Sequence, residues 1–165
     1  MDNLVRDPVI IQTKLGAFRI QFSSRGLARL EFCRVAASAP RSKQQRVVRP
    51  PYNLKRQLQR YAAGKPVRWK LPIDLSSGTS FQQKVWRVLA TIPHGETRSY
   101  GWVAQKVGKP RASRAVGAAC GANPVPIIVP CHRVIAGDGS IGGFGGGLPM
   151  KRRLLALERD SEKVG

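Results

Sequence analysis

The 165-residue chain contains little cysteine and little histidine. Its three cysteines, Cys33, Cys120 and Cys131, are odd in number and widely spaced, so a disulfide framework is not expected. The chain has two histidines and no C-x-x-C or H-x-x-x-H pair, so its ligand supply is poor for a structural zinc site. We therefore predict neither a metal nor any other cofactor.

Long apolar runs are also absent. No window approaches roughly 18 consecutive apolar residues, the length that a membrane-spanning helix needs. Residues 1–8 carry acids and no long apolar core, so a secretory signal is not expected. These absences predict a protein that is not in the membrane and that resides in the cytoplasm.

Acidic residues are scarce, because 9 Asp and Glu stand against 29 Lys and Arg for a net charge of +20. Residues 1–75 hold 16 basic and 4 acidic residues, and residues 76–165 hold 13 and 5, so both halves are basic. A positive field of this size favours polyanions such as nucleic acid. A solubilising surface or a bias of the host proteome would give the same composition, so the charge alone leaves its purpose open.

Residues 8–33 have the alternation of β-strands. Phe18, Ile20 and Phe22 alternate with polar neighbours, and turn signals at 14–16 and 23–26 separate three apolar runs. An antiparallel meander is the expected result.

Residues 34–51 carry five basic residues and no acid, which predicts an exposed loop. A solvated linker is the simpler interpretation of this basic loop, and loose phosphate contact is the alternative. A helix is predicted around Leu54, Leu58 and Tyr61, and a further strand at 67–71. We place a domain boundary near residue 76, which gives an N-terminal domain at 1–75 and a C-terminal domain at 76–165.

The C-terminal half is predicted to be helical. Ser80 to Gln83 has a capping-box pattern, Ser99 can cap a second helix, and a third runs from about 111 to 121. Two short helices joined by a tight glycine-containing turn have helix-turn-helix geometry. The fold class is therefore α+β, with a small N-terminal domain of antiparallel sheet and helix and a C-terminal helical domain.

The third of these helices is poor in large side chains, which lets its backbone approach a neighbour closely. Tight packing on another helix explains this feature as well as DNA contact does. Arg111 and Arg114 near its start favour a phosphate-facing surface. In the last helix, which we expect to begin at Pro149, Glu158 shares a face with Leu154. A carboxylate on an apolar face needs a partner. A simple salt bridge or exposure at the helix end is the simpler interpretation of Glu158, and an anchor for His132 is the functional one.

Cys131 and His132 place a nucleophile next to a base. His132 and Arg133 are expected to favour the thiolate, and a glutamate is expected to fix the imidazole and stabilise its charged form. On an extended segment neighbouring side chains point apart, so a bridging water is the expected link between them. A buried thiol with a surface imidazole is the alternative. The glycine-rich loop at 137–147 lacks a phosphate-binding pattern and instead offers backbone amides to a substrate.

These segments together resemble the O6-alkylguanine-DNA alkyltransferase family, also called methylated-DNA–protein-cysteine methyltransferases. The resemblance covers about residues 79–159, while residues 1–75 are similar only loosely. It rests on Asn123-Pro124 through Pro130-Cys131-His132-Arg133-Val134, Ser113-Arg114-Ala115-Val116-Gly117, Ser99-Tyr100, the glycine loop and Leu154-Leu155-Ala156-Leu157-Glu158.

The resemblance implies roles for the residues around the thiol. Cys131 would be the alkyl acceptor, and His132 its base through a water. Glu158 would orient His132, and Asn123 would brace the turn before the active-site segment. The hydroxyl of Tyr100 would serve N3 of the leaving guanine.

The resemblance also implies how DNA and the base are held. Arg114 would enter the base stack, and the family binds the minor groove of double-stranded DNA with its helix-turn-helix. The corresponding helix positions here are Arg111, Ala112, Ser113, Ala115 and Gly117. The pocket would be formed by Val134, Phe144, Gly145 and Gly146, with the Gly145 amide on O6 and backbone groups of Cys131 and Val134 on the amino group. Phe144 stands where many members carry tyrosine.

The implied function is direct-reversal DNA repair, in which a flipped O6-alkylguanine gives its alkyl group to Cys131 once and irreversibly. A hydrolase using Cys131, His132 and Glu158 is one alternative, and a DNA-binding module without chemistry is the other. The protein is expected to be a monomer in solution. Alkyl-size preference, activity on O4-alkylthymine and cooperativity on DNA stay open.

Overall fold

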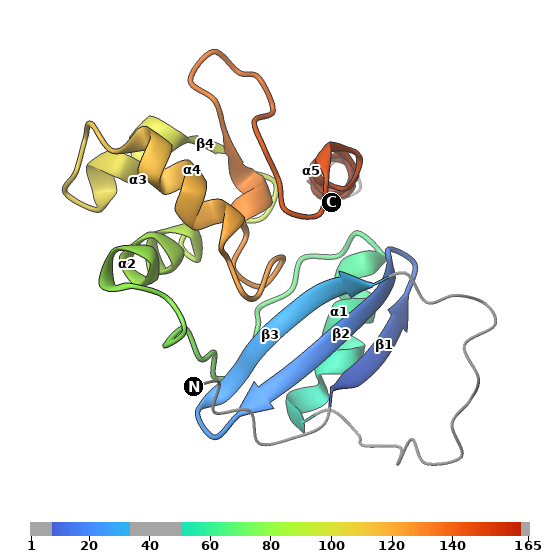
Figure 1. Cartoon of the computed structure of the whole chain (residues 1–165). Helices are drawn as coiled ribbons and strands as arrows, with labels where there is room; N and C mark the ends of the chain where they lie inside the picture. Colours follow the sequence, from blue (N-terminus) through green and yellow to red (C-terminus); the bar gives the residue numbers. More distant parts are fainter. Residues whose placement is uncertain (1–7, 34–50, 163–165) are drawn as a thin grey trace. The chain divides into compact units, whose positions relative to one another are not determined.

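The computed structural model describes residues 8–33 and 51–162, and the chain divides after Asp74 into two compact units (Figure 1). The α+β fold class is confirmed, since an antiparallel sheet occupies the first unit and helices dominate the second. The predicted basic loop at 34–51 lies outside the described residues except for Pro51. Within the described ranges, no helix combines the length and the apolar character needed to cross a bilayer.

The N-terminal unit is built on a three-stranded antiparallel sheet in the order β1-β2-β3. Its strands are β1 (Val9–Thr13), β2 (Gly16–Ser23) and β3 (Gly26–Cys33). Phe18 pairs with Ile11 on one side and Phe32 on the other, and Ile20 pairs with Leu30. Since alternate residues share a face of a sheet, these residues form one apolar layer, buried except for the half-buried Phe32. The predicted meander is confirmed.

Helix α1 (Leu54–Ala62) contacts β1 and follows a 3-10 turn, η1 (Pro51–Asn53). Leu54, Leu58 and Tyr61 lie on one face of α1, and each is at most 1% exposed. Complete burial of such side chains stabilises a fold by about 1.5–3 kcal/mol each. The opposite face of α1 is left to solvent.

The strand predicted at 67–71 does not form. Apolar and basic residues alternate there as they would in a strand, but this pattern did not lead to pairing with the sheet. The amide of Lys70 donates to the side chain of Gln57 in α1 at 3.1 Å, and Trp69 packs on the ring of Tyr61 at 5.9 Å. The segment is therefore held by α1 and not by the sheet. Contact with β3 follows only after this segment, where Leu27 forms an isolated bridge with Ile73, donates its amide to Pro72 at 2.9 Å and accepts from the Asp74 amide at 2.8 Å.

Helices α2 to α5 make up most of the C-terminal unit. They are α2 (Ser80–Leu89), α3 (Tyr100–Lys106), α4 (Ser113–Gly121) and α5 (Leu148–Glu162). Helices α2, α3 and α4 pack on one another, and the indole Nε1 of Trp86 in α2 donates to the carbonyl of Ala119 in α4 at 2.8 Å. Strands β4 (Arg98–Ser99) and β5 (Val134–Ile135) pair in parallel, next to the 3-10 turn η2 (Cys131–Arg133).

The helix boundaries differ slightly from those predicted. Thr79, not Ser80, caps α2, because Gln82 both donates its amide to Thr79 and returns its side chain to the Thr79 amide. The Ser99 cap of α3 is confirmed. Helix α4 begins at Ser113, two residues late, since the Ala112 amide bonds back to Lys109 and closes a turn.

A substitution at Gly26 would test how closely the backbone of residues 72–74 approaches β3. The φ of Gly26 is +142°, and a Cβ there would lie 2.4 Å from the carbonyl oxygen of Pro72, which accepts from the Leu27 amide. We expect Gly26→Ala to lower the free energy of unfolding by at least about 3 kcal/mol. Gly16→Ala is the control, because φ there is +120° with nothing within 4 Å of the added Cβ. That change should cost about 1 kcal/mol. Equal losses in urea unfolding would contradict the close approach at Gly26.

Candidate active site

A cavity of about 840 Å³ opens in the C-terminal unit, and the thiol-bearing residue Cys131 forms part of its wall. Helices α3 and α4 supply one side, and the glycine-rich loop between β5 and α5 supplies another. The lining residues are Ser99, Tyr100, Gly101, Ser113, Arg114, Gly117, Cys120, Gly121, Cys131, Ala136, Gly137, Gly143, Phe144 and Gly145.

Asn123 joins the end of α4 to the thiol. Its Nδ2 donates to Cys131 Sγ at 3.1 Å and to the carbonyl of Val129 at 2.8 Å, while its Oδ1 accepts from the Val125 amide at 3.0 Å. Buried Ile127 adopts a left-handed φ of 74° within the same segment. One amide side chain thus holds both ends of a tightly turned segment and contacts the sulfur.

Cys131, His132 and Arg133 form the 3-10 turn η2, so the extended segment predicted here was wrong. The amide of Arg133 donates to the carbonyl of Pro130 at 3.0 Å and closes the turn. All three residues are buried, and His132 is 0% exposed. The alternative of a surface imidazole is therefore also wrong.

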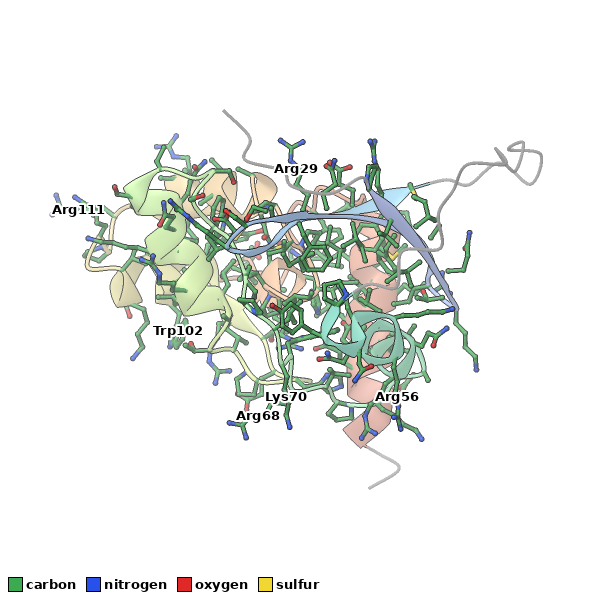
Figure 2. The ribbon with its side chains drawn as sticks, turned by 90° about the horizontal axis from the view of Figure 1, so that it is seen from below. Arg29, Arg56, Arg68, Lys70, Trp102 and Arg111 are labelled. Atoms are coloured by element: carbon green, nitrogen blue, oxygen red, sulfur yellow. The ribbon has the colours of Figure 1, made fainter. Side chains whose placement is uncertain are left out.

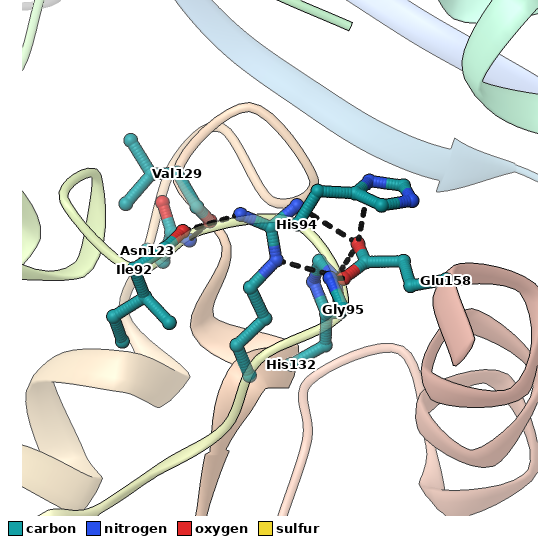
Figure 3. A network of polar contacts seen from close by, with 8 residues as sticks. Ile92, His94, Gly95, Asn123, Val129, His132 and Glu158 are labelled. Carbon is teal, nitrogen blue, oxygen red and sulfur yellow. Dashed lines mark hydrogen bonds and ion pairs between the residues drawn. The ribbon is translucent and has the colours of Figure 1, made fainter. Parts of the chain in front are cut away.

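Glu158 of α5 is the centre of a buried polar network (Figure 3). Its Oε1 lies 2.7 Å from His132 Nε2, and Arg133 donates to both oxygens, from Nε at 2.8 Å and from Nη2 at 2.9 Å. The amide of Gly95 donates to Oε2 at 3.1 Å, and Arg133 Nη1 donates to the carbonyl of Ile92 at 2.6 Å. The expected contact between Glu158 and His132 is thus present in the structure.

The network fixes the charges of its members. Burial alone would raise the pKa of Glu158, but hydrogen bonds from His132 and Arg133 outweigh it and hold that pKa well below its ordinary range. Burial lowers the pKa of His132 despite the opposing Glu158. Glu158 is therefore a carboxylate, which can only accept, so Nε2 of His132 carries a proton. The lowered pKa of His132 then leaves the ring neutral, without a proton on Nδ1. Glu158 does favour the charged imidazole, as expected, but burial outweighs it, with smaller opposing effects from the charges of Arg133 and Lys151.

The thiol is also less acidic than expected. Burial raises the pKa of Cys131, and this effect outweighs the Asn123 hydrogen bond, the Lys151 charge and the backbone amides of Cys131 and His132. The prediction that the charges of His132 and Arg133 favour the thiolate was wrong. His132 is neutral, and Arg133 is engaged by Glu158.

Lys151 is a site residue that the sequence reasoning missed. It is 0% exposed, and its Nζ donates to the carbonyls of Val134 at 2.6 Å and Gly143 at 3.1 Å, so it joins β5 to the glycine-rich loop. It also lies 5.8 Å from the centre of the Tyr100 ring. A signal was available, because Lys151 precedes Leu154 by three residues and Glu158 by seven, which puts all three on one helical face.

Tyr100 and the glycine-rich loop lie close together in the cavity wall. Gly142 has a φ of +66°, and a Cβ there would lie 2.7 Å from the Tyr100 hydroxyl, so the loop passes close to that group. Burial raises the pKa of Tyr100, with smaller contributions from Cys120 and Cys131. Cys120, a second thiol in the wall that the sequence reasoning did not place there, has its pKa raised by burial to about 12.

The remaining predicted residues divide into three groups. Ser113, Arg114, Gly117, Phe144 and Gly145 line the cavity. A second group lies on the surface outside the lining, with Arg111, Ala115 and Gly146 exposed and Ala112 half-buried. Val134 is 0% exposed behind the cavity, with its carbonyl bound by Lys151. Across the described ranges, no three His, Cys, Asp or Glu side chains gather as a metal site would require.

Two family models cover most of the chain. Residues 9–75 match the ribonuclease-like domain of 6-O-methylguanine DNA methyltransferase, and residues 80–160 match the DNA-binding domain of the same family. The chain belongs to the 6-O-methylguanine DNA methyltransferase family. The family resemblance inferred from the sequence is thus confirmed.

Individual members of the 6-O-methylguanine DNA methyltransferase family support this assignment. A methylated-DNA–protein-cysteine methyltransferase of Methanosarcina barkeri is 40% identical over 92% of this chain and 96% of its own length. One of Mycolicibacterium paratuberculosis is 55% identical, over 62% of each chain. Among solved structures, Mycobacterium tuberculosis OGT in complex with DNA superposes with a TM-score of 0.77 at 40% identity, covering 92% of both chains.

The position of Lys151 predicts an effect on the thiol. Its charge lowers the pKa of Cys131, so Lys151→Met should raise that pKa, and alkylation of Cys131 by iodoacetamide should shift to higher pH by about one unit. The rate is followed on the Cys131 peptide by mass spectrometry. Lys84→Met, at an exposed position of α2, is the control and should leave the profile unchanged. A Lys151→Met profile that coincides with wild type would remove Lys151 from the electrostatics of the site.

Proposed function

We propose that this protein repairs DNA by transferring the alkyl group of O6-alkylguanine to Cys131. The observation that carries the proposal is a thiol in the wall of an ~840 Å³ cavity, next to the buried network of His132, Arg133 and Glu158. The helices α3 and α4 that line the same cavity have helix-turn-helix geometry. Relatives named methylated-DNA–protein-cysteine methyltransferases, and one solved in complex with DNA, support the choice of substrate.

The chemical step begins with a protonated thiol, because burial raises the pKa of Cys131. As sulfur attacks the alkyl carbon, an S–C bond forms and the C–O6 bond breaks, and the thiol proton must leave. His132 receives it at Nδ1 through a water, since Nε2 is already engaged by Glu158. Glu158 then stabilises the imidazolium, so that it acts through His132 and does not touch the substrate.

The leaving guanine needs a proton or hydrogen bonds where negative charge develops. Tyr100 supplies the proton to N3, and its raised pKa keeps the hydroxyl protonated until that moment. The amide of Gly145, in the cavity wall, donates to O6. Backbone groups of Cys131 and Val134 recognise the amino group. Phe144 packs against the flat face of the base.

The target base reaches Cys131 only after it leaves the duplex. An alkyl group on O6 lies inside the base stack, so the nucleotide must flip at a cost of a few kcal/mol. Arg114 is exposed and lines the cavity, and in this proposal it fills the vacated space. The small residues Ala112, Ser113, Ala115 and Gly117, with Arg111 beside them, let α4 enter the minor groove. A single protomer supplies every one of these groups, so the protein acts as a monomer.

The proposed chemistry fixes the number of alkyl groups that one protein molecule can accept. The product is a thioether that no group in the site can cleave, so each molecule should react once. After incubation with DNA carrying O6-methylguanine, the Cys131 peptide should gain about 14 Da, with one equivalent transferred per protein. Cys131→Ser is the control and should gain nothing. Turnover beyond one equivalent, or ester hydrolysis without transfer, would favour a cysteine hydrolase, and DNA binding with no mass gain would favour a binding module.

The role of Arg114 in base flipping can be separated from the alkyl-transfer step by comparing a duplex substrate with a free base. Arg114→Ala should slow repair of O6-methylguanine in duplex DNA by at least about tenfold, because the flipped state loses its support. Reaction with free O6-benzylguanine needs no flipping and should change less than about twofold. Arg87→Ala, which removes an exposed arginine from α2, is the matched control. Equal losses on both substrates would show that Arg114 does not act through flipping.

A further inference from the structure

The N-terminal unit carries a cluster of cations that the proposed chemistry does not use. Six basic residues between 55 and 70 are exposed: Lys55, Arg56, Arg60, Lys65, Arg68 and Lys70. We call these six residues the basic face. No acidic residue occurs from 51 to 73, so the basic face has no counter-charge from its own segment.

The basic face is held in a fixed shape. Gln57 accepts from the Lys70 amide at 3.1 Å and donates to the carbonyl of Tyr52 at 2.6 Å. Arg60 Nε donates to the carbonyl of Pro66 at 3.2 Å, and Trp69 packs on Tyr61. The segment after α1 is thus fastened along the helix, and Figure 2 shows Arg56, Arg68 and Lys70 pointing outward. These contacts also explain why residues 67–71 do not form the predicted strand.

An ordinary solvated helix face mixes acids with bases, because oppositely charged side chains four residues apart stabilise a helix and like charges destabilise it. Arg56 and Arg60 stand four residues apart on α1 with no acid between them. The arrangement therefore opposes folding slightly, and a bound polyanion would relieve that repulsion.

The chemistry of the basic face favours phosphates over a protein partner. Protein interfaces have an apolar core, whereas the exposed large hydrophobic residues of the described ranges are Ile10, Tyr52 and Leu148, none of them in the basic face. Trp69 is half-buried and packs on the ring of Tyr61 at 5.9 Å. One exposed ring beside the basic face, that of Tyr52, is too little for an apolar interface core. Six cations with so little apolar surface match the sequence-independent contact that proteins make with a DNA backbone.

We propose that the basic face is a second DNA-binding surface, which contacts the phosphate backbone of double-stranded DNA independently of α4. This inference rests on the proposed function, because that function is what identifies the bound polyanion as DNA. Contacts of this kind add affinity for undamaged duplex and carry no sequence information. The N-terminal unit then helps the protein stay on DNA while the helix-turn-helix encounters damaged bases.

The test compares two triple variants of the full chain, each of which lowers the net charge by three. One is Arg56→Gln, Arg68→Gln and Lys70→Gln in the basic face. The other is Lys14→Gln, Arg19→Gln and Arg25→Gln, at exposed positions in or between the strands of the sheet. Affinity for a short undamaged duplex is measured against salt concentration by fluorescence anisotropy, and thermal unfolding checks that both variants fold.

The basic-face variant should bind the duplex at least about tenfold more weakly at low salt, and its slope of log affinity against log salt should fall by about 0.9 per lost contact. The sheet variant should stay within about twofold of wild type. Equal losses of affinity in the two variants would show that only net charge matters and would overturn the proposal. Unchanged affinity in both variants would overturn it as well. Displacement of the duplex by polyglutamate at equal charge concentration would assign the face to acidic protein and also overturn it.

Two further measurements distinguish a failure of the basic-face proposal from a structural effect of the substitutions and from a failure of the proposed function. Arg56→Lys with Arg68→Lys keeps the charge and should keep the wild-type salt slope; a loss as large as that of the glutamine variant would overturn the proposal. Transfer from free O6-benzylguanine to Cys131 is measured in parallel and should be unchanged in the basic-face variant. Absence of transfer in wild type would refute the proposed function, whereas the salt slopes would still decide the basic face.

Discussion

The site depends on one buried carboxylate, Glu158, which lies between a charged guanidinium and a neutral imidazole. Arg133 donates to both of its oxygens and His132 contacts one of them. The same carboxylate accepts from Gly95, so it joins α5, the η2 turn and the loop after α2. Removal of one partner of a buried ion pair typically costs about 3–5 kcal/mol, because the other charge is left uncompensated. The geometry around Cys131 is therefore inseparable from this contact.

The charge distribution in the network suits a thiol that is deprotonated only during reaction. Arg133 balances Glu158, so His132 stays neutral and can accept a proton, and burial keeps Cys131 protonated at rest. Lys151 adds a nearby cation that favours sulfur as its charge develops. Such an arrangement would suit the proposed single reaction, because a resting thiolate would be open to other electrophiles.

Much of this could be predicted from the sequence, and the failures share a cause. Periodicity and punctuation gave the antiparallel meander and the helix-turn-helix, and the helical spacing of Glu158 gave its buried face. The failures at 67–71, at Arg133 and at Lys151 come from contacts between residues distant in the chain or across a turn. Local alternation cannot show that a side chain of α1 captures a backbone amide, nor that an arginine beside the histidine takes the same carboxylate.

The protonation state of His132 tests the account most directly. The chain has two histidines, and His94 Nδ1 lies 4.0 Å from the same Glu158 oxygen that His132 contacts. Nitrogen-15 NMR shifts of the wild-type protein therefore report the tautomer and charge of His132, and a His94→Gln variant is used only to assign the two imidazoles. Between pH 7 and about pH 6, near the ordinary pKa of histidine, we predict a neutral ring with the proton on Nε2 and a bare Nδ1. A ring protonated on Nδ1, or an imidazolium at pH 7, would contradict the assignment of His132 as the proton acceptor for Cys131.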